Sequence, residues 1–426
     1  MNIKKRLDIK LIALSVVTGI LIGLLVSLFR VLIPFLNSFV LDILSLSKER
    51  PLYILIFSLL FIALGCISSY CVHKEPNISG SGIPQVSGKL QHKLKYSWLS
   101  ALVYKYIGGL AAIGSGLTLG REGPSVQIGA SIAEGVAKLN KEDEETTRSL
   151  IISGAGSGLG VAFNAPISGI IFSLEELSKR ILSSSFMITG LTVLTANSVS
   201  VLIIGNQVSI PVNESYSVAV ALWPAIIILG VLCALSGTLF TKLVLLGKKF
   251  YALLPLPKLI KHLIPFIATA LILLMDASLL GSGSELMLLP NTSHLSPELC
   301  LYYYLAKFFL LLVAFCSGIP GGIFFPLLVL GSLLGSLYAS LLASLGLIPE
   351  SAILFLSVIA MSAHFAAIVR APLTGIFLIL EMTGGSLHFL MPIMIITVSA
   401  YFVSDLLGAK PIYEELLHYN LTQEKQ

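Results

Sequence analysis

Two opposite charges lie side by side in an apolar part of this sequence. The segment LTLGREGPSVQ, residues 117–127, places Arg121 and Glu122 between two glycines, and Pro124 follows at once. Proline is favoured in the first turn of a helix, and glycine lets the preceding backbone turn sharply. Because the free N–H groups and the dipole of a helix start attract anions, the Glu122 carboxylate would compete there with an anionic ligand. Protonation would remove that competing charge, so one side chain could couple anion movement to proton movement.

The pattern of glycine before proline occurs three times. The three motifs are GSGIP (Gly80, Ser81, Gly82, Ile83, Pro84), GREGP (Gly120, Arg121, Glu122, Gly123, Pro124) and GIFFP (Gly322, Ile323, Phe324, Phe325, Pro326). A single motif of this kind also fits a packing kink, but three together favour helix starts that converge. Backbone N–H groups, the Ser81 hydroxyl and a tyrosine hydroxyl could then replace the hydration shell of a small anion and still release it. A cation path would instead be lined by acidic groups.

The composition indicates a polytopic membrane protein. Of the 426 residues, 56% are hydrophobic and only 12% are charged, with a mean hydropathy of +0.93. An ordinary soluble domain has about 25% charged residues. Apolar runs that could each form a membrane span, for which about 20 residues suffice, occupy residues 11–29, 52–68, 186–205, 218–240, 263–280, 301–316, 352–369 and 389–403. The net charge of +5 is spread over loops and forms no stripe for nucleic acid.

The charged ends and loops predict an orientation. Lys4, Lys5, Arg6 and Lys10 precede the first apolar run, which is longer than a signal peptide's hydrophobic region and lacks a small-residue cleavage site. We therefore expect an uncleaved first span with a cytoplasmic N-terminus. The lysine-rich segment 89–95 and the segment 141–148 are interpreted as solvated loops.

The sequence offers no signature of an enzyme or a metal site. The five cysteines form no C-x-x-C pair, and the seven histidines form no H-E-x-x-H motif. A G-x-S-x-G motif is also missing. We therefore expect no enzymatic activity, no bound metal and no cofactor.

An internal repeat divides the chain into two halves. Ala165-Pro166 and the residues after it recur as Ala371-Pro372, at an offset of 206 residues (372 − 166), and GREGP recurs as GIFFP at an offset of 202 (326 − 124). The repeats span about 52–206 and 218–407 and are expected to form one membrane domain over residues 1–426. Transporters are often built from such repeats. The similarity itself leaves parallel and inverted halves both open.

The motifs, taken with KPIY at residues 410–413, resemble those of the CLC family of chloride channels and proton-coupled chloride transporters. Four motifs in the family's order and a similarity over about 12–418 make this match specific. The resemblance implies an all-α fold of two inverted halves, with discontinuous helices whose N-termini meet at an anion path. It also implies a homodimer with one pore in each subunit, in membrane lipid. No nucleotide-binding regulatory domain is expected after KPIY.

The resemblance assigns chloride ligands to four positions. Ser81 and Tyr413 would supply hydroxyl donors, and the backbone N–H groups of Ile323 and Phe324 would complete the site. The transported ions would be chloride and protons, across what we expect to be the inner membrane of a bacterium.

Two glutamates would carry the protons. Glu122 resembles the family's gating glutamate and external proton acceptor, and Glu176 resembles its internal proton-transfer glutamate. With both present, chloride/proton exchange is favoured, and a passive chloride channel gated by voltage or protons is the alternative. A solvated charge at a helix end, near Lys179 and Arg180, is a second interpretation of Glu176 and the preferred one for Glu175.

Other intramembrane charges are harder to assign from sequence. Lys105 and Arg121 could raise the positive potential around the anion path, whereas Glu381 is expected to be structural. In several relatives acidic residues would follow GSGIP, but here Gln85 and Ser87 occupy those positions. Arg121 is therefore left without an evident acidic partner beyond its neighbour.

Overall fold

The computed structural model is mainly helical in the part that it describes. Described are residues 9–47, 50–179, 185–206, 210, 222–287, 296–385 and 387–423. Within these residues the one β-type pairing is a bridge between Gly120 and Gly322. Arg180 and the expected start of the second repeat at Val218 lie outside the described residues.

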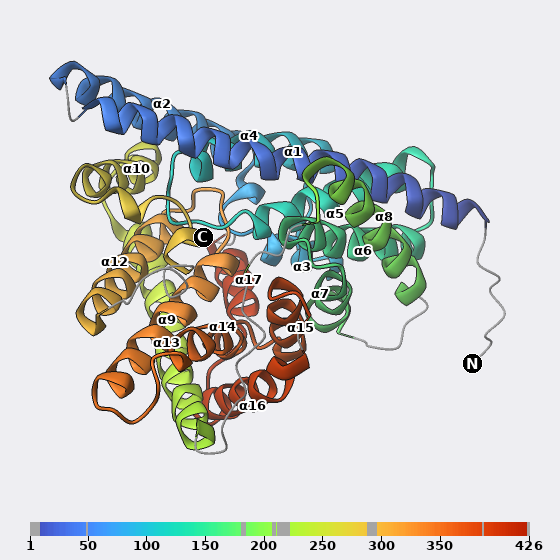
Figure 1. The fold of residues 1–426 in the computed structure, drawn as a ribbon. Helices are drawn as coiled ribbons and strands as arrows, with labels where there is room; N and C mark the ends of the chain where they lie inside the picture. The colour runs from blue at the N-terminus through green and yellow to red at the C-terminus, as the bar shows by residue number, and fades with distance from the viewer. Residues whose placement is uncertain are drawn as a thin grey trace.

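The chain forms helices of very unequal length (Figure 1). In the first half they are α1 (Ile9–Ser47), α2 (Pro51–Lys74), η1 (Pro76–Ile78), α3 (Ile83–Leu90), α4 (Trp98–Gly114), α5 (Glu122–Leu139), α6 (Glu144–Phe163), α7 (Pro166–Phe172), η2 (Ser173–Ser178) and α8 (Ser185–Ile204). In the second half they are α9 (Trp223–Leu253), α10 (Lys258–Met275), η4 (Ala277–Leu279), α12 (Pro297–Cys316), α13 (Phe324–Ser344), α14 (Ala352–Val369), α15 (Pro372–Met382), η5 (Leu387–Phe389), α16 (Leu390–Leu406) and α17 (Ile412–Gln423).

Nine helices of the described residues are long and apolar enough to cross a membrane. Eight correspond to the apolar runs expected from the sequence. The ninth, α13, is not among those runs, and glycine and serine residues interrupt its apolar sequence. These small residues pack against α14: a Cβ atom on Gly331 or on Gly335 would lie 2.8 Å from a backbone carbonyl oxygen of that helix. The small residues of α13 are therefore explained by its position in the interior of the protein, where it packs against another helix and not against lipid.

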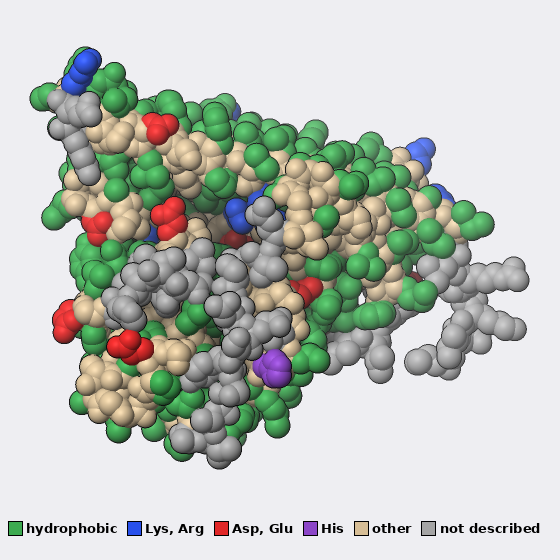
Figure 2. All heavy atoms as spheres, viewed as in Figure 1, with side chains coloured by type: hydrophobic (Ala, Val, Ile, Leu, Met, Phe, Trp, Pro, Cys, Tyr) green, Lys and Arg blue, Asp and Glu red, His purple; other side chains and the backbone are tan. Residues whose placement is uncertain are grey.

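The outer surface is apolar where a bilayer would cover it. Figure 2 shows hydrophobic side chains over most of the long wall formed by α1 and α2, with few charged groups among them. Leu28, Phe35 and Leu59 are about half exposed or more on these two helices. In water such a surface would be an aggregation liability. In lipid it is the expected exterior of an integral membrane protein.

The two halves are related by a local two-fold arrangement. The Glu175 carboxylate accepts hydrogen bonds from the backbone N–H groups of Leu373 and Thr374 at the start of α15, at 3.0 and 2.8 Å. Reciprocally, Glu381 accepts from the backbone N–H groups at the start of α7, at 2.9 and 2.7 Å. Each half thus caps a helix of the other half with a carboxylate, which satisfies N–H groups that have no intrahelical acceptor.

A second reciprocal contact lies at the centre of the molecule. Gly120 and Gly322 each donate a backbone N–H to the other's carbonyl oxygen at 2.7 Å. Helices α5 and α13 begin beside this pair and extend to opposite sides of the molecule (Figure 1). The two halves are therefore inverted, which the repeat in the sequence left open.

The carboxylate caps predict a matched loss of stability. Replacing either Glu175 or Glu381 by glutamine removes the charge that faces a helix start, so Glu175→Gln and Glu381→Gln should each cost about 1–2 kcal/mol of unfolding free energy. Thermal unfolding in detergent should show a lower melting temperature for both variants. Asp42→Asn is the control, because Asp42 is an exposed carboxylate near the C-terminal end of α1, away from any helix start. Equal melting temperatures for all four proteins would contradict the assigned role.

Candidate anion site

The three glycine–proline motifs converge on one point. Besides the Gly120–Gly322 pair, the N–H of Gly321 donates to the carbonyl oxygen of Gly80 at 3.0 Å. A Cβ atom on Gly123 would lie 2.8 Å from the Ser81 carbonyl oxygen and 3.2 Å from the Gly322 Cα atom. Only glycine permits this approach of three backbone segments. Residues separated by more than 200 positions in the sequence therefore share one small volume.

Each motif ends in a helix start, as the sequence predicts. Helices α3, α5 and α13 begin at Ile83, Glu122 and Phe324, and each has its motif proline in the first turn. The N–H groups of a first helical turn have no intrahelical acceptor. Their dipoles add a positive potential at the same end. Three such ends around one volume favour an anion without placing a fixed cation in it.

The Glu122 side chain lies inside this volume. It is only 2% exposed, and the backbone N–H groups of Glu122 itself and of Phe325 face its carboxylate. Its Oε2 atom has no hydrogen-bond partner. A carboxylate buried at two helix starts occupies the position in which a free anion would be stabilised.

The Arg121 guanidinium lies close to the Glu122 carboxylate. Neighbouring side chains at a helix start usually point apart, but the Arg121 Nε atom lies 3.9 Å from a Glu122 carboxylate oxygen. The Arg121 side chain is 25% exposed, and its Nε atom has no hydrogen-bond partner. The pair is therefore a loose one, and a positive charge stays beside the Glu122 carboxylate.

Two hydroxyl groups face the same interior. Ser81 and Tyr413 are 2% and 1% exposed, and neither hydroxyl oxygen has a hydrogen-bond partner in the protein. The two hydroxyls are adjacent, and Tyr413 also lies within electrostatic reach of Glu122 and Glu176. Leaving a buried hydroxyl without a partner costs about 1–3 kcal/mol, so two converging ones indicate a place for a ligand.

The backbone N–H groups expected at Ile323 and Phe324 lie at the start of α13. Ile323 is the residue preceding the helix and Phe324 is its first residue, and both are fully buried. The Phe324 ring packs against Phe365 with 4.3 Å between centroids, and also against Phe163 at 5.2 Å. These rings hold the helix start in place. Phe325, which the sequence analysis named only as part of the GIFFP motif, supplies a further backbone N–H group, and that group faces Glu122.

Glu176 lies at a distortion of the helix. It belongs to the π-helical turn Ser173–Ser178 that follows α7, and it is only 7% exposed. Turns of this kind often occur at functional sites. Its neighbour Glu175 points the other way and caps α15. The interpretation of Glu175 as a solvated helix-end charge is therefore wrong, because its carboxylate has backbone partners in the other half.

Lys105 has a structural contact that the sequence did not reveal. It is fully buried, and its Nζ atom donates to the carbonyl oxygens of Ile78 and Gly80, both at 2.7 Å. Its counterpart Lys307, 202 residues later (307 − 105), binds the carbonyl oxygens of Leu279 and Gly281 at 2.7 and 2.8 Å in the same manner. Lys105 thus holds the loop that carries Ser81. The sequence does carry a signal for this pair of contacts, because Lys105 and Lys307 are separated by the same 202 residues as the motifs GREGP and GIFFP.

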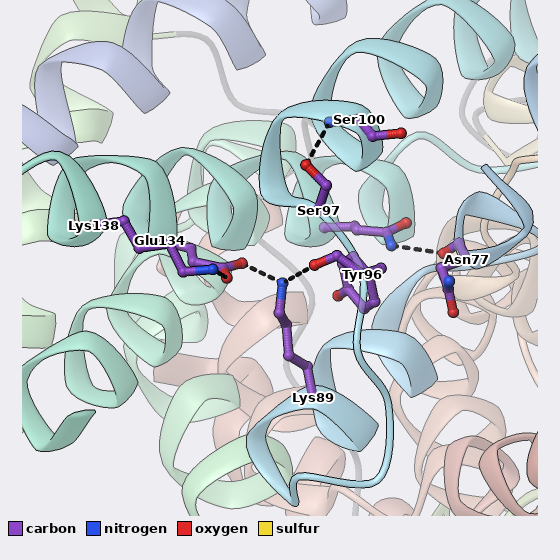
Figure 3. Close-up of polar contacts among 8 residues, drawn as sticks. Asn77, Lys89, Tyr96, Ser97, Ser100, Glu134 and Lys138 are labelled. Atoms are coloured by element: carbon purple, nitrogen blue, oxygen red, sulfur yellow. Dashed lines mark hydrogen bonds and ion pairs between the residues drawn. The ribbon is translucent and has the colours of Figure 1, made fainter. Parts of the chain in front are cut away.

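A further lysine joins α3 to α5. The Lys89 ammonium pairs with the Glu134 carboxylate, donates to the Tyr96 carbonyl oxygen at 2.9 Å, and lies 3.9 Å from the Tyr96 ring centroid (Figure 3). The interpretation of 89–95 as a plain solvated loop is therefore wrong at Lys89, which lies in the last turn of α3. Residues 144–148 likewise belong to α6. The Lys89 contact fixes the angle between the two helices whose starts carry Ser81 and Glu122.

The described residues contain no group of three or more His, Cys, Asp or Glu side chains that could hold a metal ion. The chemistry of the site is that of hydrogen-bond donors and two carboxylates.

Comparisons with known proteins agree on one family. A profile described as "voltage gated chloride channel" matches residues 64–405. The H(+)/Cl(−) exchange transporter ClcA of Vibrio vulnificus (strain YJ016) is 33% identical over 430 residues, which cover 98% of this chain and 91% of that protein. ClcA of Klebsiella pneumoniae (strain ATCC 700721) is 33% identical over 404 residues, covering 89% of this chain and 83% of the relative.

Solved structures show the same fold. The crystal structure of a slow cyanobacterial Cl−/H+ antiporter superposes with a TM-score of 0.92 and 29% identity, covering 98% of this chain and 99% of the other. A eukaryotic CLC transporter superposes with a TM-score of 0.80 at 23% identity, over 96% of this chain and 74% of that one. From its fold, its motifs and these matches, the chain belongs to the voltage-gated chloride channel family, the CLC family.

Proposed function

We propose that this protein exchanges chloride for protons across a membrane. The observation that carries the proposal is the position of the Glu122 carboxylate, which lies buried at the starts of α5 and α13 beside the unpartnered Ser81 and Tyr413 hydroxyls. Relatives with related sequence are named as chloride/proton exchangers.

Chloride and the Glu122 carboxylate compete for one place. Chloride enters between the Ser81 and Tyr413 hydroxyls and the backbone N–H groups of Ile323 and Phe324. While Glu122 is ionised, it occupies the adjoining anion position at the helix starts. Protonation removes its negative charge, so the side chain leaves and chloride passes. Since the donors carry no full charge, chloride is bound weakly enough to be released.

Glu176 passes protons to and from the opposite side. It lies buried in the π-helical turn, and both Glu122 and Glu176 are within electrostatic reach of Tyr413. The proton route therefore runs between the two carboxylates past the chloride site and leaves the chloride route at Glu176. A buried intramembrane carboxylate without a functional role would be costly to retain.

A passive chloride channel, gated by voltage or protons, is the second candidate. Such a channel needs a competing carboxylate at Glu122 but has no use for a second buried carboxylate on the other side of Tyr413. The presence of Glu176 favours exchange.

The surface charges support the proposed cytoplasmic position of the N-terminus. Lys10 at the start of α1 pairs with Glu142 in the loop after α5, at 2.5 Å, so these segments lie on the same side of the membrane. That side also carries Lys138 and Lys141, as expected for a cytoplasmic face. The protein acts in the inner membrane of a bacterium, with a cytoplasmic N-terminus, as a homodimer with one pore in each subunit.

The direct test of exchange uses the purified protein in liposomes. With a chloride gradient imposed and no initial pH gradient, chloride flux should drive protons uphill. Chloride flux without uphill proton movement would leave the passive channel as the correct function.

Glu122→Ala should separate the two ions. Removing the carboxylate leaves the anion path open and removes the proton acceptor, so chloride flux should persist while proton coupling falls by about a hundredfold or more. Chloride flux in this variant should also no longer depend on pH between 4 and 8, roughly the range over which carboxylates titrate in proteins. The measurement is paired chloride and pH recording in the liposome assay. Retained coupling would show that another residue accepts the external proton.

Glu176→Ala should affect protons selectively. Because the chloride ligands are untouched, chloride binding should stay within about twofold of wild type while proton transport falls by about a hundredfold. Glu415→Ala, which removes a partly exposed carboxylate near Lys410, is the matched control and should transport both ions normally. A proportional loss of both ions in Glu176→Ala would instead indicate a structural role.

A further inference from the structure

An ion pair joins the segment of Glu176 to the helix of Tyr413. The Lys179 ammonium pairs with the Glu414 carboxylate, and both side chains are about half exposed. Lys179 directly follows the π-helical turn that contains Glu176. Glu414 lies in the first turn of α17, next to Tyr413 in the chain. The pair therefore connects the segment of the proposed internal proton acceptor with that of a proposed chloride ligand.

The Lys179 ammonium also lies within electrostatic reach of the Glu176 carboxylate. Among the charged groups of the described residues that act on Glu176, Lys179 is the one cation, and the others are Glu414 and Glu175. The Glu175 carboxylate is already held by backbone N–H groups at the start of α15. Tyr413 contributes a neutral hydroxyl. Glu414 and Glu176 thus compete for one ammonium group, and Glu176 attracts it only when ionised.

The internal repeat shows that this arrangement belongs to one half of the molecule. Both halves have the carboxylate that caps a helix of the other half. The positions of Glu176 and Lys179, however, are occupied by Met382 and Gly385 in the second half (382 − 176 and 385 − 179 both give 206). The shared fold therefore forms without these two side chains, and they occur together in the half that contains the proton acceptor.

The backbone at Lys179 favours a use of its side chain. Lys179 has a φ of 52°, in the left-handed region, and the equivalent Gly385 has a φ of 81°. Glycine adopts this conformation without the steric cost that a lysine has there. A half-exposed ion pair stabilises a protein only slightly, so bracing alone is a weak reason for a lysine at this position. A role of the ammonium group beside Glu176 is the better explanation.

We propose that Lys179 transmits the charge state of Glu176 to α17 and so to Tyr413. While Glu176 is protonated, the ammonium stays on Glu414 and holds the start of α17. When Glu176 is ionised, it draws the ammonium toward itself and the Lys179–Glu414 pair loosens, so the Tyr413 hydroxyl can shift relative to the bound chloride. The inference rests on the proposed exchange and adds Lys179 and Glu414 to it as positioning residues.

The first test measures the proton-to-chloride ratio in liposomes. Lys179→Met and Glu414→Gln each break the pair, so each should lower the ratio about threefold to tenfold, while chloride turnover stays within about twofold of wild type. Glu415→Gln is the matched control, since it breaks the neighbouring pair with Lys410 in the same helical turn and should keep the wild-type ratio.

Three results of this test would overturn the proposal. The first is a wild-type ratio in both pair variants, which would leave an ordinary surface ion pair. The second is a changed ratio in one pair variant alone, which would mean that this residue acts on Glu176 without its partner. The third is an equal fall in Glu415→Gln, which would point to general damage at the start of α17.

A double-mutant cycle tests the link without transport. Unfolding free energies in detergent, for Lys179→Met, Glu414→Gln and the double variant, give the interaction between the two side chains. The cycle is run at about pH 9, above the pKa of most buried carboxylates. In a Glu176→Gln background no charge competes for the ammonium, so the interaction, as an equilibrium constant, should be about threefold to tenfold stronger than with Glu176 present.

Equal interactions in the two backgrounds would overturn the proposal. Because the cycle follows unfolding alone, it gives an answer even if the wild type moves no protons. Failure of exchange and failure of the Lys179 link are thus told apart.

Discussion

Unpaired backbone N–H groups in the interior of the protein are the constraint on which this structure depends. In a bilayer such groups have no water to bind, so a helix can begin at that depth only where its N–H groups face a ligand or another part of the protein. Here the starts of α5 and α13 meet at the Gly120–Gly322 pair, and the Glu122 carboxylate faces the N–H groups beside it. A chloride ion and a carboxylate satisfy the same need, which makes them competitors.

The contacts around this centre keep the helix starts from collapsing onto one another. Lys105 fixes the loop before α3, and Lys89 fixes the other end of that helix against α5. Glu175 and Glu381 tie the halves together where α7 and α15 begin. Charged side chains thus serve as braces within the membrane domain, whereas the Glu122 carboxylate faces backbone N–H groups at the starts of α5 and α13.

Much of this site could be predicted from sequence, because glycine and proline report local backbone geometry directly. The motifs around Ser81, Glu122 and Phe324 therefore indicated helix starts, and the structure has them. Contacts between distant segments leave no such local mark. The burial of Lys105, the Glu175 cap and the inverted orientation depend on which loops meet in three dimensions. The span at α13 was missed for a related reason: its small residues reflect packing against α14 rather than contact with lipid.

The central claim is that the Glu122 carboxylate and a halide ion occupy the same position, and diffraction from crystals soaked in bromide tests it most directly. Glu122→Gln has nearly the same shape but no charge. The account predicts an anomalous bromide peak at the starts of α5 and α13 in Glu122→Gln and none there in the wild type at neutral pH. A second peak, between the Ser81 and Tyr413 hydroxyls, should appear in both proteins. A peak beside an unmoved Glu122 carboxylate in the wild type, or an empty helix start in the variant, would contradict the account.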